Sequence, residues 1–175
     1  MRGINVGGKH VVKMAELRAL LSSMGFAGIQ THIQSGNVIL QSDRPADQLK
    51  AQLEAAIEAH FGFPVPVILR SQAQLNALIA SLPFSPEQIA QADAASETVS
   101  LYVALFDHTP SLAGIEALEP YISEEERLIV QDADAYLLLH QGMRNARLVQ
   151  KIGILGPFTM RNWNTLCRLK EMAAI

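Results

Sequence analysis

The feature of this sequence that most constrains its fold is an order of apolar patterns that occurs twice. In the first occurrence, apolar residues recur at helical spacing over 14–24. Two β-rich runs, 29–33 and 38–40, then flank a Ser-Gly-Asn turn at 35–37 and predict a hairpin. A second helical stripe follows Pro45. Helix, hairpin and helix in this order predict helices that cover one face of an antiparallel sheet.

Three further segments separate the two occurrences. Val65–Leu69 has the composition of a short strand. Ser71 with Gln74 fits a capping box, which predicts the start of another helix. Residues 84–96 are polar and rich in alanine with no strong period, so we interpret them as a connection.

The same order then returns. An apolar strand is predicted over 98–106, and Thr109-Pro110 predicts the start of a helix. A hairpin is predicted over 127–140, and a looped basic stretch leads to Thr159 as the N-cap of the last helix. The predicted fold class is therefore α+β, with two ferredoxin-like halves of the βαββαβ type and antiparallel sheets. The halves span residues 1–83 and 97–175, the second with a terminal helix, and 84–96 links them.

The first half lacks one element of this pattern. A βαββαβ unit needs a strand before its first helix, and only 2–6 precede the double glycine. We therefore expect the first strand of the N-terminal half to be truncated. Either 2–6 form a stub, another segment fills the gap, or the true start codon lies upstream. An exposed sheet edge would favour pairing between chains, which predicts a homodimer.

Composition restricts the class of protein further. With 49% hydrophobic and 18% charged residues in 175, the chain is globular. No apolar run reaches the ~18 residues of a membrane span, and no secretory signal opens the chain. One cysteine, Cys167, agrees with a reducing compartment, so we expect a cytoplasmic protein. The net charge of −3 disfavours broad binding to nucleic acid.

The charge is distributed unevenly along the chain. Residues 1–41 hold four bases and one acid, whereas 87–134 hold eleven acids and one base. Residues 141–170 hold six bases and no acid. We interpret the acidic run as a solvated face. The basic run predicts an anionic partner if its cations converge on one surface.

A glycine-rich segment near the N-terminus is the first candidate for a ligand site. Residues 3–9 match the glycine and lysine spacing of a phosphate-binding P-loop, but His10 stands where Ser or Thr would bind magnesium. No full strand precedes the segment, so a nucleotide triphosphatase is disfavoured. The glycines still allow a ligand to approach the backbone closely. The ligand-binding residues predicted here are Arg2, Asn5, Gly7, Gly8 and Lys9. The alternative is that the glycines only turn the chain.

The predicted start of the last helix is the second candidate. A helix N-terminus carries partial positive charge, and Arg161, Asn162 and Asn164 add donors suited to an anion. The alternative is a capped helix anchored in the core by Trp163. In the predicted hairpin turn, Ser35 and Asn37 are further ligand-binding candidates.

No arrangement of residues typical of catalysis is visible. The five histidines are scattered without metal-ligand spacing, and neither G-x-S-x-G nor H-E-x-x-H occurs. Three consecutive acids at 124–126 point in different directions, which argues against a paired-carboxylate mechanism. We therefore assign no catalytic residue, metal or cofactor, and favour a binding protein over an enzyme.

Several long motifs resemble the domain-of-unknown-function 1697 family over nearly the whole chain. They are Arg2-Gly3-Ile4-Asn5-Val6-Gly7-Gly8, Met14-Ala15-Glu16-Leu17-Arg18, Gly25-Phe26, Thr31-His32-Ile33-Gln34-Ser35-Gly36-Asn37-Val38 and Thr159-x-Arg161-Asn162-Trp163-Asn164-Thr165. The resemblance implies an α+β protein of ferredoxin-like halves, cytoplasmic and bacterial, and it implies no activity. An apolar strand usually precedes Arg-Gly-Ile-Asn in this family and is missing here. Residues 144–148 also depart from the expected Arg-Ser-Lys-Leu.

Three functions follow from these observations. The leading hypothesis is a protein that binds an anionic ligand, such as a nucleotide, a phosphorylated metabolite or a nucleic-acid end. The second is an enzyme acting on a phosphorylated or nucleotide-like substrate, with Lys9, His10 or His32 as acid or base. The third and least favoured is an RNA-binding module, because only three aromatic residues lie on predicted strands: Tyr102, Phe106 and Tyr136.

Overall fold

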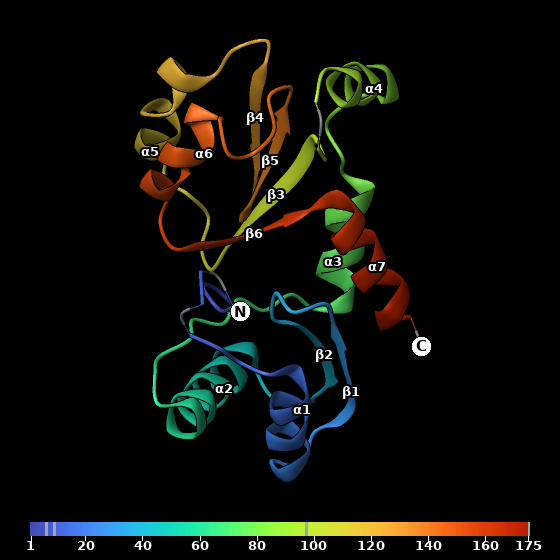
Figure 1. The fold of residues 1–175 in the computed structure, drawn as a ribbon, viewed down its shortest axis with the longest axis vertical. Helices are drawn as coiled ribbons and strands as arrows, with labels where there is room; N and C mark the ends of the chain where they lie inside the picture. The colour runs from blue at the N-terminus through green and yellow to red at the C-terminus, as the bar shows by residue number, and fades with distance from the viewer. Residues whose placement is uncertain (6, 9, 97, 175) are drawn as a thin grey trace. The chain divides into compact units, whose positions relative to one another are not determined.

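The computed structural model describes residues 1–5, 7–8, 10–96 and 98–174 (Figure 1). Helices accompany a two-stranded and a four-stranded antiparallel sheet, which confirms the predicted α+β class. The chain divides into two compact units. Unit 1 comprises 1–72 and 168–175, and unit 2 comprises 73–167. The boundaries predicted from sequence lie at 83 and 97 instead, and the return of 168–175 to unit 1 was not expected.

Unit 1 follows the predicted order of elements. These are α1 (Met14–Ser23), β1 (Ala27–His32), β2 (Asn37–Gln41) and α2 (Ala46–Phe61). Buried apolar residues of α1 and α2 share a core, and the half-buried Val38 and Leu40 of β2 pack against it. In the described residues no strand precedes α1, as the pattern predicts.

Residues 65–69, which the sequence predicts to be a strand, belong to neither sheet. Val65 and Val67 are buried in the core of unit 1, so the alternating pattern reports burial correctly. A strand also needs a ladder of backbone hydrogen bonds with a neighbour. Here the Arg2 N–H donates to the Pro66 carbonyl oxygen at 3.0 Å, and Glu54 Oε1 accepts from the Val67 N–H at 2.8 Å. These bonds do not form such a ladder, so the segment is not a strand.

Unit 2 is built on the four-stranded sheet, in the order β4-β5-β3-β6 with every neighbouring pair antiparallel. Its elements are α3 (Gln72–Ala80), α4 (Pro86–Ala95), β3 (Leu101–Phe106), α5 (Leu112–Glu116), η1 (Glu119–Tyr121), β4 (Glu126–Gln131), β5 (Asp134–Leu139), α6 (Arg147–Lys151), η2 (Ile152–Leu155), β6 (Phe158–Asn162) and the start of α7 (Trp163–Ala173). From β3 to β6 the order is the predicted βαββαβ. The stretch before Thr159, expected to be a loop, contains α6 and η2.

The sheet of unit 2 is covered on both faces, whereas the sequence predicts helices on one face. Alternate residues of β3, such as Ala104 and Phe106, pack in a core shared with residues of α6 and η2. On the opposite face the Tyr136 hydroxyl of β5 donates to the Leu78 carbonyl of α3 at 2.7 Å. The prediction fails because β3 is apolar at nearly every position, so both of its faces require burial.

The segment 84–96, expected to be a connection, contains α4. Ser85 Oγ accepts from the Gln88 N–H, and Gln88 Oε1 accepts from the Ser85 N–H, which completes a capping box. Pro86 occupies the first turn and Ala92 is fully buried. The weak apolar period hid a helix whose start signal was present in the sequence.

Two predicted helix starts are displaced. Thr159 lies inside β6 opposite Leu105, so it is not the N-cap of the last helix. The helix begins at Trp163, and Asn162 Oδ1 caps it by accepting from the Thr165 N–H at 2.8 Å. Likewise α5 begins after Ser111, rather than at Thr109-Pro110. In the described residues no helix combines the length and apolar character needed to cross a bilayer.

Candidate functional site

The glycine-rich segment forms a closed loop in unit 1. We call it the glycine loop and define it as the described residues 3–5, 7–8 and 10–12. Asn5 closes it. Its backbone N–H donates to the His10 carbonyl at 3.1 Å, and its Oδ1 accepts from the Val12 N–H at 2.9 Å. Its Nδ2 donates to the Val12 carbonyl at 2.9 Å. Asn5 has a φ of 55°, a conformation that asparagine tolerates better than most residues.

The same Asn5 amide joins the glycine loop to the turn between β1 and β2. Nδ2 also donates to the Gln34 carbonyl at 2.7 Å. Next to this contact, the buried Ile4 packs against Gly36, and the Met1 amino group donates to the Gly36 carbonyl at 3.3 Å. The loop and the turn are therefore one connected structure.

Ser35 and Asn37 hold the turn itself. Asn37 is buried, and its Nδ2 donates to Ser35 Oγ at 2.9 Å and to the His32 carbonyl at 3.3 Å. These bonds show how the two predicted ligand-binding side chains shape the turn that supports the loop.

The two glycines of the loop expose their backbone. Gly7 and Gly8 are exposed, with φ values of 61° and 74°. In the described part of the chain, neither glycine N–H donates to another backbone group. Arg2, five residues before Gly7 in the sequence, is also exposed, and Lys9 lies outside the described residues. The loop thus presents amide donors at its surface.

Apolar and aromatic groups surround these donors, a property that the sequence analysis missed. The His10 ring stacks on Phe63, with centroids 4.6 Å apart and planes 21° apart. Val11 is 55% exposed and Ile33 is 54% exposed. His10 and Ile33 have φ values of 51° and 50°, which are unusual for residues other than glycine and especially for a β-branched one. The signal available in the sequence was Val11-Val12, an apolar pair between His10 and Lys13.

The second predicted group of donors belongs to unit 2, and its place in the fold differs from the one predicted. Arg161 lies on β6 rather than on the last helix, and its Nη1 donates to the Met160 carbonyl at 2.7 Å. Burial lowers the pKa of Arg161 because it penalises the charged guanidinium. Asn162 is the N-cap of α7, and Asn164 is exposed in its first turn.

The structure thus brings together one predicted group, made of Asn5, Gly7, Gly8, Ser35 and Asn37, within unit 1. Arg161, Asn162 and Asn164 belong to unit 2.

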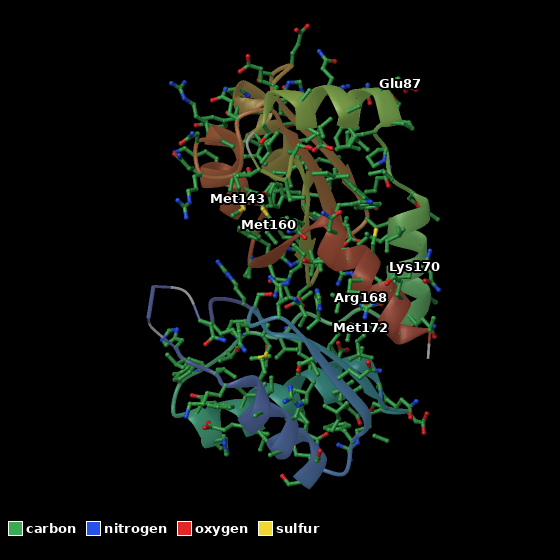
Figure 2. All side chains as sticks on the ribbon, turned by 45° about the vertical axis from the view of Figure 1, so that its right-hand side comes forward. Glu87, Met143, Met160, Arg168, Lys170 and Met172 are labelled. Atoms are coloured by element: carbon green, nitrogen blue, oxygen red, sulfur yellow. The ribbon has the colours of Figure 1, made fainter. Side chains whose placement is uncertain are left out.

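The basic end of the chain is divided among several elements. Arg144, Arg147 and Lys151 are exposed on α6 and the segment before it, in unit 2. Arg168 and Lys170 lie in the part of α7 that belongs to unit 1 (Figure 2). Arg168 pairs with Glu171 at 2.8 Å. The six cations counted in sequence therefore belong to two units.

In the acidic run, Glu126 has a structural role. It is buried, and its Oε1 and Oε2 accept from the backbone N–H groups of Arg147 and Leu148 at 3.1 and 2.7 Å. A carboxylate at this position favours the start of α6 because the helix N-terminus carries partial positive charge.

The aromatic residues expected for RNA binding are mostly inaccessible. Phe106 is fully buried and Tyr136 is 1% exposed. Tyr102 is half-buried against the core of unit 2. A sheet that stacks bases must expose its aromatic rings, so this geometry counts against the RNA-binding hypothesis.

Comparison with known proteins places the chain in a family. A family described as proteins of unknown function, DUF1697, matches residues 1–136. The chain belongs to the DUF1697 family. It is similar to the structure of conserved bacterial protein SP0830 from Streptococcus pneumoniae, at 23% identity, a TM-score of 0.69 and coverage of 98% of this chain and 94% of that chain. At this identity the likeness shows the fold alone. No curated protein matches the chain.

Proposed function

We propose that the protein binds an anionic or phosphorylated ligand at the glycine loop of unit 1. The observation that carries the proposal is the pair of exposed glycines, Gly7 and Gly8, in a loop that Asn5 closes and ties to the hairpin turn. A loop fixed before binding loses little conformational entropy when the ligand arrives. Backbone N–H groups aimed at an anion form charge-assisted hydrogen bonds, the stronger kind.

The proposal assigns different roles to the predicted residues. Asn5, Ser35 and Asn37 already make hydrogen bonds inside unit 1, so we assign them to positioning the loop and the turn. Gly7 and Gly8 supply amide donors to the ligand. Arg2 and Lys9 supply positive charge, which raises the local concentration of anions.

Titration calorimetry with inorganic pyrophosphate tests this proposal. We expect saturable binding that weakens roughly tenfold in Arg2→Gln, the equivalent of about 1.4 kcal/mol. Asn5→Ala releases the loop from Val12 and Gln34, and we expect a loss at least as large. Arg44→Gln is the matched control, because Arg44 is an exposed arginine of unit 1 on the segment before α2.

Two results would contradict the proposal. One is the absence of saturable binding to the wild-type protein. The other is an equal loss in Arg2→Gln and Arg44→Gln, because binding would then follow net charge rather than the loop. Circular dichroism of each variant separates weakened binding from unfolding.

The N-terminus of α7 is the second element proposed to bind an anion. The Asn162 side chain already accepts from the Thr165 N–H, so this end offers fewer open donors than an uncapped helix. Asn164→Asp places a negative charge in its first turn. If this end holds pyrophosphate, the variant binds it more weakly. Unchanged binding would assign the anion to the glycine loop alone.

One observation favours catalysis as a second candidate function. His10 is exposed within the glycine loop, which places a titratable ring in the same loop as the proposed amide donors. Phosphorus NMR of the protein incubated with pyrophosphate would detect hydrolysis. We expect His10→Gln to abolish any turnover, and turnover that persists in this variant would refute the assignment.

A further inference from the structure

We propose that the ligand of the glycine loop is a nucleotide, whose phosphate meets the loop amides and whose base stacks on His10. This inference rests on the anion-binding function proposed above. It follows from the aromatic and apolar side chains beside the amide donors, because such side chains suit a flat apolar group rather than a second charged group.

The first observation is the arrangement of two rings. Phe63 is half-buried against the core of unit 1 and also contacts the Phe61 ring, at 6.4 Å between centroids. His10 stacks on Phe63 and is itself exposed. A ring held on a core aromatic has a fixed plane, and its exposed side is a platform on which a base can stack.

The second observation is the backbone that holds this ring. His10 adopts a φ of 51°, and Ile33 on the adjoining turn adopts a φ of 50°. Such conformations cost free energy in residues with side chains, and they persist where the surrounding structure fixes them. Both strained residues are exposed, so burial of their own side chains does not account for the strain.

The third observation is an apolar surface beside the donors. The Val12 and Gln34 carbonyls accept from the same Asn5 Nδ2, at 2.9 and 2.7 Å. Val11 and Ile33 are the chain neighbours of these two residues, so both lie close to Asn5. Both residues are exposed, at 55% for Val11 and 54% for Ile33. An inorganic anion or a sugar phosphate would leave these apolar groups in water, whereas a base would cover apolar surface.

The spacing along the loop fits a small ligand. Gly8 and His10 are two residues apart, a span of at most ~7 Å for an extended chain. One compact molecule can therefore place a phosphate at the Gly8 amide and a base on the His10 ring. A nucleoside monophosphate contains both of these groups.

Titration calorimetry with AMP, GMP, CMP and UMP, compared with ribose 5-phosphate, tests the inference. We expect at least one nucleotide to bind tenfold or more tightly than ribose 5-phosphate. His10→Ala should remove this difference while changing the affinity for ribose 5-phosphate less than twofold. His60→Ala is the matched control, because His60 is also an exposed histidine of unit 1 whose ring contacts a phenylalanine, Phe61, at 4.7 Å.

The possible outcomes separate this inference from the proposed function. If ribose 5-phosphate binds as tightly as every nucleotide, the base makes no contact and the inference is overturned while anion binding stands. If neither class binds, the proposed function itself fails. An equal loss in His10→Ala and His60→Ala would also overturn the inference. Proton NMR provides an independent measure, because a stacked base shifts the His10 ring protons upfield and ribose 5-phosphate does not.

Discussion

The contact between Ile4 and Gly36 allows a quantitative prediction about how the start of the chain is held. A Cβ added at Gly36 would lie 2.6 Å from Ile4 Cδ1 and 3.1 Å from Met1 Cβ. Ile4 is 3% exposed, so its side chain has little room to move away. Gly36 also has a φ of 76°. Gly36→Ala therefore introduces both backbone strain and a steric overlap in unit 1.

The two effects can be estimated separately. An alanine at positive φ costs about 1–2 kcal/mol, of which about 0.4–1 kcal/mol is returned by the lower entropy of the unfolded chain. Overpacking a buried site adds about 1–3 kcal/mol. We expect Gly36→Ala to lower the free energy of unfolding by about 2–4 kcal/mol. Gly62→Ala, at a φ of 80° with nothing within 4 Å of the added Cβ, should lower it by about 1 kcal/mol.

Urea denaturation followed by circular dichroism measures both variants under the same conditions. The reasoning is refuted if the two variants lose the same stability, because the contact with Ile4 would then contribute nothing. A double-mutant cycle makes the test sharper. Ile4→Val removes the atom closest to the added Cβ, so it should cost less in the Gly36→Ala background than in the wild type.

Three further predictions concern unit 2. Burial, together with the nearby negative charges of Asp134 and Asp132, raises the pKa of Tyr136 to about 12. The folded state therefore favours the protonated phenol, and this contribution to the free energy of unfolding declines as pH rises from about 10 to about 12. Tyr136→Phe should remove that decline and cost about 1–2 kcal/mol at pH 7, measured by urea denaturation at a series of pH values. Glu126→Ala leaves the buried Leu148 N–H without its acceptor and should cost about 2–4 kcal/mol, whereas Glu126→Gln, which retains an acceptor oxygen, should cost less in thermal unfolding. Ser85→Ala should cost about 1 kcal/mol and increase amide hydrogen exchange in the first turn of α4; unchanged exchange would contradict a capping role.

Local patterns in the sequence predicted the elements that depend on local interactions. The apolar spacing that predicts α1 corresponds to the buried Met14, Leu17 and Leu21. The turn at 35–37 joins β1 and β2 as expected. The prediction of Thr159 as a helix cap was wrong, because Thr159 pairs in the sheet with Leu105, a residue more than fifty positions away in the chain. Sequence alone does not distinguish a threonine that caps a helix from a threonine in a strand whose partner strand is distant along the chain.

The candidate site was predictable in its composition and only partly in its geometry. The glycines were identified because they let a ligand approach the backbone closely, and Asn5 was identified because its amide is a donor suited to an anion. The hydrogen-bond partners were not predicted, because one of them, Gln34, lies 29 residues away in the turn between β1 and β2. The stacking of His10 on Phe63 was missed for the same reason, since the two rings come from segments more than fifty residues apart.

The position of β6 in the sheet has a consequence for how the chain folds as it is synthesised. β3 lies between β5 and β6, and Val103 faces Arg161 across the ladder. One edge of the apolar strand β3 therefore stays unpaired until the ribosome has synthesised residues 158–162, more than fifty residues after β3, and residues 168–175 of unit 1 are made later still. Such late, long-range pairing slows folding and leaves nascent chains prone to aggregate. Newly made chains of this protein should therefore depend on chaperones more than a protein of this size with sequential strand order.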